Sequence, residues 1–378
     1  MKRATVVLCG VFVSTPIWAQ SSVTLYGAVD DGFTFTNNQG GSKNYQLSNG
    51  ALGSSKWGIL VNEDLGGGLH TVARLENGFD INSGELGNDG RLFGRQAYVG
   101  LGGGFGTLTL GRQYDLVADA LMPMAATLKF AGTLATHAAD VDNIWGDYPL
   151  SNVIKYNSPV IHGFKASGLF SLGGVAGAFS DNRTEAVSLG YSDSALAASA
   201  VFSRINNPAT ALYYASSIPQ SGSTFSNPIT NPTFSGYVSA RTLQTAGAGL
   251  NYKLGGATIG AVYTNVRFED VVPTSSTPFS GTASFNNYEI NGTYLFTPAL
   301  TVGVGYTYTK AETAKYNQIN FGTEYQLSKR TGLYATAVWE HASGTDSTGK
   351  PATAALAFIT PSSTPNQVAV RVGVRHVF

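Results

Sequence analysis

The stretch Val368–Phe378, VAVRVGVRHVF, decides the fold of this chain. Valines occupy every second position from 368 to 374, so they share one face of an extended strand. The opposite face carries Ala369, Arg371, Gly373 and Arg375. A strand that has lipid on one side and water on the other needs this alternation, which is typical of a transmembrane β-barrel. A soluble edge strand could carry the same pattern, so its recurrence along the chain has to decide.

The same alternation recurs in other segments. Residues 299–310 place apolar side chains on one face and only threonines and glycines on the other, and residues 315–327 and 69–76 repeat the pattern. In a β-sandwich the apolar face would be the core, but the opposite face here is too polar and too rich in glycine to cover another layer. The 46 glycines, 19 tyrosines and 20 phenylalanines suit strands, tight turns and aromatic girdles.

Turn signals along the chain alternate between short and long connections. The short ones lie at residues 66–68, 102–104, 159, 192–194, 255–256, 298 and 328–330. The long ones lie at residues 37–54, 81–92, 114–150, 173–183, 205–239, 269–283 and 342–365, with one short exception near 310–315. Outer-membrane barrels have this asymmetry, with turns in the periplasm and loops outside. The rhythm predicts an all-β fold, a sixteen-stranded antiparallel transmembrane β-barrel with both termini in the periplasm.

Residues 1–19 have the features of a secretory signal peptide, with two basic residues, an apolar run over Val6–Val13 and a cleavage site after Ala19. No stretch of the chain holds about 18 consecutive apolar residues, so we expect no transmembrane helix. The predicted organisation is a signal peptide followed by one barrel over residues 20–378. The single cysteine, Cys9, lies in the signal, which excludes disulfides and thiol catalysis in the exported chain.

Charge and motif content exclude several classes of function. Without the signal, 21 basic residues face 23 acidic ones, and a net charge of −2 argues against a nucleic-acid partner. The five histidines are scattered and stand in no nucleophile or metal-binding motif. The glycine run at 102–106 lacks the spacing and the following helix of a phosphate cradle. We therefore expect no enzymatic activity, no cofactor and no metal site.

Four motifs resemble the general porins of Gram-negative bacteria, especially the β-proteobacterial branch. They are LYGAVDDG at 25–32, NEDLGGGL at 62–69, RQAYVGLGGGFGTLTLGRQ at 95–113 and VGVRHVF at 372–378. The resemblance implies an outer-membrane channel for passive diffusion of ions and small hydrophilic solutes, assembled as a homotrimer among outer-membrane lipid and lipopolysaccharide. It also implies a third loop folded into the pore, and a terminal Phe378 that is read by the barrel-assembly machinery.

In general porins, basic residues on the barrel wall face acidic residues on the inserted loop. Low-dielectric walls focus the field of these charges at the narrowest point. By comparison with the motifs, Lys56 and Arg95 fall where the family places wall arginines. Arg74 and Glu76 are predicted to face the lumen on the third strand, and Lys155 joins them if the sixth strand keeps its phase.

The third loop, residues 114–150, supplies the acidic candidates of the constriction, which are Asp115, Asp119, Asp140 and Asp142. Its centre departs from the family, because the usual acidic tip is replaced by MPMAATLKF, which has no carboxylate and brings Lys129. We hypothesise that Asp119, Asp140 and Asp142 carry the acidic side. Arg112 is left unassigned, since strict alternation points it outward, where lipid exposure costs about 2 to 4 kcal/mol unless a strand end, bulge or interface relieves it.

Two other kinds of barrel stay open from the sequence. A plugged adhesive or structural barrel could act through the aromatic loop at residues 205–239. A channel that prefers one substrate often has an aromatic track in its lumen, whereas the tyrosines and phenylalanines here fall mainly on the outward phase, as at Tyr306 and Phe321. The sequence leaves the sign of ion selectivity undetermined.

Overall fold

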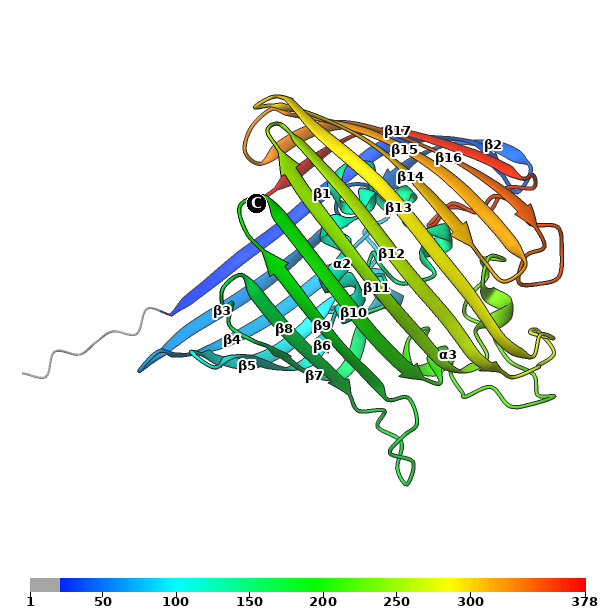
Figure 1. Cartoon of the computed structure of the whole chain (residues 1–378), viewed down its shortest axis with the longest axis horizontal. Coiled ribbons are helices and arrows are strands. Elements are labelled where there is room, and N and C mark those ends of the chain that lie inside the picture. The colour runs from blue at the N-terminus through cyan, green and yellow to red at the C-terminus, as the bar shows by residue number, and fades with distance from the viewer. Residues whose placement is uncertain (1–20) are drawn as a thin grey trace, which may run out of the picture.

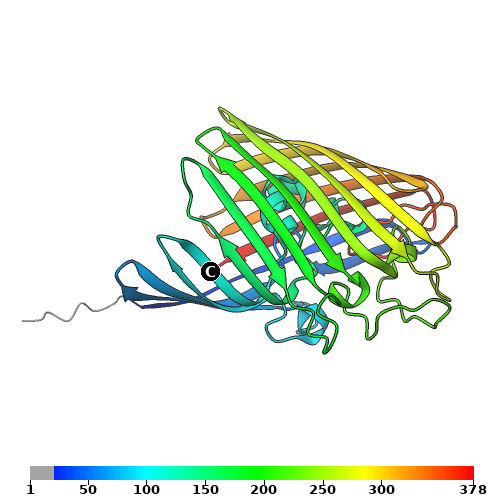
Figure 2. The same cartoon turned by 60° about the horizontal axis from the view of Figure 1, so that its bottom comes forward.

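The computed structural model describes residues 21–378, and the signal peptide expected at 1–19 lies outside the described residues. The chain forms one antiparallel β-sheet that closes on itself (Figure 1, Figure 2). Sixteen strands complete the ring, and a further strand, β2, pairs with β1 beyond the end of β3. The predicted sixteen-stranded barrel is confirmed.

The strands are β1 (Ser22–Gln39), β2 (Ser42–Asn49), β3 (Lys56–Gly66), β4 (Leu69–Gly78), β5 (Gln96–Gly103), β6 (Gly106–Gln113), β7 (Leu150–Asn157), β8 (Phe164–Ser171), β9 (Thr184–Ser192), β10 (Leu196–Asn206), β11 (Ala240–Leu254), β12 (Ala257–Val271), β13 (Gly281–Thr297), β14 (Leu300–Lys310), β15 (Ala314–Gln326), β16 (Thr331–Gly344) and β17 (Asn366–Val377). Short helical turns lie in the connections: α1 (Gly87–Gly90), α2 (Leu116–Leu121), η1 (Met122–Met124), η2 (Thr127–Ala131), η3 (Thr133–Ala135), η4 (Ala138–Asp140), α3 (Pro208–Ala211) and η5 (Ser235–Tyr237). None of the helices within residues 21–378 is long and apolar enough to cross a membrane.

The ring closes between the first and last strands. β1 pairs with β17 over Ala28–Thr36 on one edge and with β3 over Ser22–Ala28 on the other. Gly27 and Phe378 exchange two backbone hydrogen bonds of 3.0 Å each. The Phe378 ring covers Gly27 so closely that a β-carbon at position 27 would collide with it. Closure therefore needs both the register of β17 and a glycine on β1.

The segment predicted as a loop at 37–54 contains the extra strand. Gly40 and Gly41, with φ of 61° and 105°, make the turn that returns the chain as β2. Tyr45 of β2 packs against Phe35 of β1 with ring centroids 5.1 Å apart, a cross-strand pair that stabilises the hairpin. The chain then turns inward after Gly50 and buries Leu52. The predicted loop start at residue 37 is too early, since β1 continues to Gln39. The glycine pair lies inside the alternating pattern rather than at its end.

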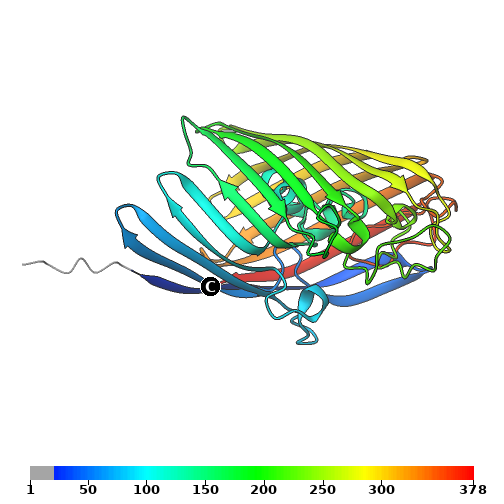
Figure 3. The same ribbon diagram turned by 90° about the horizontal axis from the view of Figure 1, so that it is seen from below.

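Short and long connections lie at opposite ends of the barrel, which we call the turn end and the loop end. Turns of two residues join β3 to β4, β5 to β6 and β11 to β12, whereas 36 residues, 114–149, connect β6 to β7. Figure 3 shows the hairpins of the turn end on one side and the long loops on the other. The expected exception is present, since only residues 311–313 join β14 to β15.

Alternation along the strands separates two environments. On β17 the side chain of Val372 is 58% exposed on the outer wall, whereas Arg371 is 4% exposed on the lumen side. Tyr306 and Phe321 also lie exposed on the outer wall, as expected. The outward face is thus apolar and the inward face polar, which is the arrangement that a lipid bilayer and an aqueous lumen require.

The connection at residues 114–149 folds into the lumen, and we call it the constriction loop (Figure 1). Its α2 segment contacts β9, β10 and β11, and its η2 segment crosses to β14, β15 and β16. The Phe130 ring lies against Gly303, and the Phe130 carbonyl oxygen lies against Gly322, so neither glycine has room for a β-carbon. The inward fold of the third loop therefore depends on glycine at these two positions of the barrel wall.

Candidate functional site

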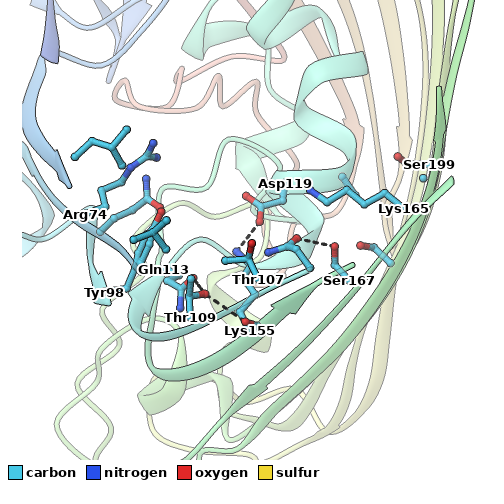
Figure 4. A pocket seen from close by; sticks show the side chains of 17 residues that line it. Arg74, Tyr98, Thr107, Thr109, Gln113, Asp119, Lys155, Lys165, Ser167 and Ser199 are labelled. Atoms are coloured by element: carbon cyan, nitrogen blue, oxygen red, sulfur yellow. Dashed lines mark hydrogen bonds and ion pairs between the residues drawn. The ribbon is translucent and has the colours of Figure 1, made fainter. Parts of the chain in front are cut away.

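A cavity of about 560 Å³ lies between the constriction loop and the wall formed by β3 to β10. Its charged lining consists of three cations, Arg74, Lys155 and Lys165, and one carboxylate, Asp119. In Figure 4 Arg74 and Tyr98 lie on one side, Lys165 on the other, and Asp119 between them. Hydroxyl and amide groups fill most of the remaining lining. The cavity can hold water and hydrophilic solutes, and it has a surplus of positive charge.

The central ion pair joins the constriction loop to the wall. Lys155 on β7 places Nζ 2.5 Å from Asp119 Oδ2 on α2 and donates to the Tyr114 carbonyl oxygen at 2.8 Å. The residue before α2, Asp115, is its N-cap, and the Asp115 side chain accepts from the Ala118 N–H at 2.8 Å. The cap directs the first turn of α2 so that Asp119, four residues later, reaches the lumen.

A second cluster brings together wall residues that are far apart in the sequence. Glu76 on β4 is 2% exposed and accepts from Arg95 Nε at 2.9 Å, from the Tyr26 hydroxyl at 2.7 Å and from the Tyr114 hydroxyl at 3.3 Å. Lys56 at the start of β3 also exerts an electrostatic effect on Glu76. The structure thus gathers four of the five predicted wall residues, since Arg74 lies over the Tyr26 ring at 5.5 Å. Lys155 belongs to the other cluster.

The four acidic candidates of the constriction loop occupy different environments. Asp119 has a 41% exposed side chain in the lumen cavity. Asp115 is buried as the α2 cap and also accepts from Asn143 at 2.8 Å. Asp140 accepts from the Trp145 N–H at 3.1 Å, and burial raises its pKa well above the ordinary value. Asp142 is buried against His137 and Thr264. Only Asp119 therefore presents its carboxylate to the cavity, because the other three are used in packing the loop.

Among the lumen charges that were not sequence candidates, two bear on the charge balance of the cavities. Lys165 on β8 lines the main cavity. Asp147, near the end of the constriction loop, lines two smaller cavities toward the loop end. Burial raises the Asp147 pKa to about 6, with Asp89 acting in the same direction and Arg95 opposing. Strict alternation from Phe164 would have placed Lys165 inward, whereas no local pattern marks Asp147.

Arg112 is held at the end of β6 by hydrogen bonds to neighbouring segments. The register shifts between Gly111 and Gln113, and Gly111 has φ of 136°, which is a bulge. The guanidinium donates to the Gly94 carbonyl oxygen at 2.6 Å and to the Tyr214 hydroxyl at 2.7 Å. The bulge and the end of the strand allow the guanidinium to make these hydrogen bonds, which avoid the free-energy cost of exposing an arginine to lipid.

No group of three or more His, Cys, Asp or Glu side chains that could hold a metal ion occurs within residues 21–378. Fixed charges, hydroxyls and amides line the main cavity.

Comparison with known proteins agrees with this geometry. The sequence profile of the Gram-negative porin family matches residues 4–345. The chain belongs to the Gram-negative porin family. This membership makes it a channel protein rather than an enzyme and places the porin in the outer membrane as a multi-pass protein.

Two curated relatives are similar over most of their length. The porin is 27% identical to an outer membrane porin protein of Bordetella pertussis over 84% of this chain and 88% of the relative. It is also 27% identical to outer membrane porin protein 32 of Delftia acidovorans over 100% of both chains. The expected β-proteobacterial resemblance therefore extends over the whole sequence.

Solved structures show the same fold. An anion-selective porin from Comamonas acidovorans superimposes with a TM-score of 0.74 at 22% identity, covering 95% of this chain and 100% of that one. The trimer form of OmpT from Vibrio cholerae gives a TM-score of 0.61 at 16% identity, covering 95% and 99%. At these identities the superpositions show the barrel fold alone.

Proposed function

We propose that this porin is a water-filled channel for passive diffusion of ions and small hydrophilic solutes, with a preference for anions. The observation that carries the proposal is the lining of the main cavity, in which three cations stand against one carboxylate. Asp119 pairs with Lys155, so Arg74 and Lys165 set the local charge. A low-dielectric wall concentrates the field of such charges in the lumen and favours permeating anions.

The second cluster supports the same sign. Glu76 is enclosed by Arg95 and two tyrosine hydroxyls. These groups largely compensate its negative charge, so Glu76 contributes little field to the lumen. Asp140 and Asp142 lie in the interior of the loop packing and contribute little field to the cavity. An anion-selective porin is also among the structural neighbours.

The test is the reversal potential of single channels in a planar bilayer under a KCl gradient. Anion preference predicts a reversal potential of the sign set by chloride, with conductance steps that are stable and ohmic. A cation-selective reversal potential would overturn the proposed sign. Absence of conductance from folded barrels would favour a plugged barrel, in which the buried side chains of residues 205–239, such as Leu212 and Phe234, close the mouth.

We propose further that the porin is a homotrimer that associates through the outer wall of β3 to β6. The exposed outward side chains there are aliphatic, as at Leu75, Val99 and Leu110, whereas β13 to β15 carry exposed tyrosines and phenylalanines. Aromatic girdles mark lipid contact, so the aliphatic sector suits a protein partner. Sedimentation of the detergent-solubilised protein, at one or at three times the chain mass, decides between the alternatives.

The remaining partners follow from the position of the barrel. We propose that Phe378, paired to Gly27 at the closing seam, is the residue that the barrel-assembly machinery reads, and that lipopolysaccharide surrounds the aromatic sector at the loop end. Deletion of Phe378 should lower the yield of barrels in outer membranes while leaving refolding in detergent possible. Equal yields in vivo would contradict the assignment.

A further inference from the structure

A histidine and two carboxylates are enclosed where the constriction loop meets the wall. His137 is fully buried, with Nδ1 2.6 Å from Asp142 Oδ2 on the same loop and Nε2 3.3 Å from Glu289 Oε2 on β13. The second contact has ion-pair distance without an aligned hydrogen bond, since neither Nε2 nor Oε2 has a hydrogen-bond partner within residues 21–378. The attraction between His137 and Glu289 is therefore mainly electrostatic.

The charges around the ring make the imidazolium the favoured form. The acidic groups that face it are Asp142 and, farther away, Asp140 from the loop, and Glu289 from β13, while β12 contributes the neutral Thr264. Burial disfavours a charged imidazole, but Asp142 and Glu289 outweigh it and raise the His137 pKa to about 10. Two buried carboxylates this close together need a cation between them, because an uncompensated buried charge is strongly destabilising.

Hydrogen bonds from neutral donors to the two carboxylates complete the attachment. The Thr264 hydroxyl donates to Asp142 at 2.6 Å, and the Ala126 N–H donates to Glu289 Oε1 at 2.7 Å. Lys129, the other cation of this part of the loop, donates to two asparagine side chains at 2.9 and 2.6 Å rather than to a carboxylate. Among these contacts, the one between His137 and Glu289 joins a loop cation to a wall carboxylate.

We propose that His137 is the positioning residue of the pore, which keeps the constriction loop against β12 and β13 by joining the loop carboxylate Asp142 to the wall carboxylate Glu289. The inference rests on the proposed channel function. Loss of the imidazolium charge leaves the carboxylates of Asp142 and Glu289 facing the same ring with no cation between them. The loop then detaches intermittently and interrupts the current.

The structure offers a reversible tether for testing this. A β-carbon at Gly305 would lie 3.4 Å from the Ala126 β-carbon, close to the roughly 3.5 to 4.5 Å that a disulfide spans. Since Cys9 is the only cysteine in the sequence and belongs to the signal, a pair introduced by Ala126→Cys and Gly305→Cys would be unique in the exported protein. Oxidation would fix the loop to β14 independently of His137.

The experiment records single-channel currents of the wild type, His137→Gln, the tethered pair, and the tethered pair with His137→Gln, each oxidised and reduced. His137→Gln should raise the fraction of time in closed or sub-conducting states at least about tenfold, as expected when a buried ion pair loses one partner. The oxidised tether should abolish that increase, and dithiothreitol should restore it. His341→Gln, which removes a rim histidine bonded to Asn366, is the matched control and should behave as the wild type.

Two further variants separate positioning from simple loss of stability. Combining His137→Gln with Glu289→Gln removes the repulsion between the two uncompensated carboxylates and should return the closed fraction toward the wild-type value. Raising the pH through about 10 should make the wild type flicker while leaving His137→Gln unchanged, since the folded protein loses the favourable imidazolium above that pKa. If the wild-type and His137→Gln currents are both steady, the inference about His137 is wrong and the proposed channel function is unaffected. A silent wild type would instead contradict the proposed function.

Discussion

At the residue scale, the chain uses its charged side chains in two distinct ways. Arg74 and Lys165 line the cavity, whereas Asp142 and Glu289 are spent on holding the constriction loop. Sequence spacing alone could not divide them, because the assignment depends on partners far apart in the chain. His137 and Glu289, for example, are separated by 152 positions. The sequence shows which side chains carry charge. Whether a charged side chain faces the cavity or is buried depends on how the loop packs against the wall.

Replacing Arg74 by Gln should weaken anion preference. A unit positive charge about 4 Å from an ion favours an anion and disfavours a cation by about 1 kcal/mol each in a water-like medium, so the anion-to-cation permeability ratio should fall by up to roughly thirtyfold. The measurement is the reversal potential in a KCl gradient. Lys329→Gln, in the exposed turn after β15, is the control and should leave the ratio unchanged. An unaltered ratio in Arg74→Gln would remove this arginine from the selectivity site.

Asp147 should make selectivity depend on pH. Its raised pKa of about 6 means that the folded protein holds this proton more tightly than an unfolded chain does, so negative charge appears as the pH rises through 6. Anion preference should therefore be stronger at pH 5 than at pH 7.5. Asp147→Asn should flatten this part of the profile. Retention of the full difference in that variant would assign the titration to another group.

At the element scale, the alternating strands and the short turns were predictable because each depends on local sequence. The glycine pair at 40–41 could have signalled the β2 hairpin, but the outward Tyr45 and its contact with Phe35 became apparent only with the strands paired. The path of the constriction loop was expected from the family resemblance. The contacts of Phe130 with Gly303 and Gly322 could not be predicted, because in the sequence those glycines look like ordinary strand positions.

A side chain in place of Gly322 should displace the constriction loop. A side chain at Gly322 would meet the Phe130 carbonyl oxygen, which cannot rotate aside, so Gly322→Val should give noisier channels of altered conductance. Gly292→Val is the matched control, because its β-carbon would meet only the Thr258 carbonyl oxygen, at 3.8 Å. Current recordings of both variants check the expectation, and equal noise would show that the loop does not depend on this contact.

Removing the cap of α2 should loosen the loop thermally. Asp115→Ala deletes the acceptor for the Ala118 N–H, which typically costs about 1 kcal/mol. The unfolding temperature in detergent, followed by circular dichroism, should fall accordingly. Asp115→Asn keeps a capping oxygen and should unfold close to the wild-type temperature. If both variants unfold together, the charge of Asp115 matters rather than the cap.

At the scale of the whole molecule, the exposed outward side chains are aliphatic over β3 to β6, whereas those over β13 to β15 include tyrosines and phenylalanines. Composition predicted that aromatic residues would surround the barrel, but their uneven distribution emerged only when the strands were placed in order. This asymmetry is the basis on which assembly can be tested.

A bulky aromatic side chain should disturb the aliphatic sector. Val99 on β5 is 56% exposed, and Val99→Trp should lower the fraction of trimers because a protein interface has no room for the indole. Val187 on β9 is 60% exposed, and Val187→Trp should leave the trimer intact because lipid chains accommodate the ring. Analytical ultracentrifugation distinguishes the two. Trimers of normal stability in both variants would place the interface elsewhere.

The constriction loop and the loop between β16 and β17 also leave the two sides of the interior with different tolerance to mutation. Polar side chains such as Asn287, Gln318 and Glu340 point inward from β13, β15 and β16, yet each is at most 2% exposed, because loop segments cover them. A scan of inward positions should therefore yield conductance phenotypes on one half and folding phenotypes on the other. For redesign of the pore, this confines adjustable positions to the arc that solutes touch, while the opposite arc has to be preserved as scaffold.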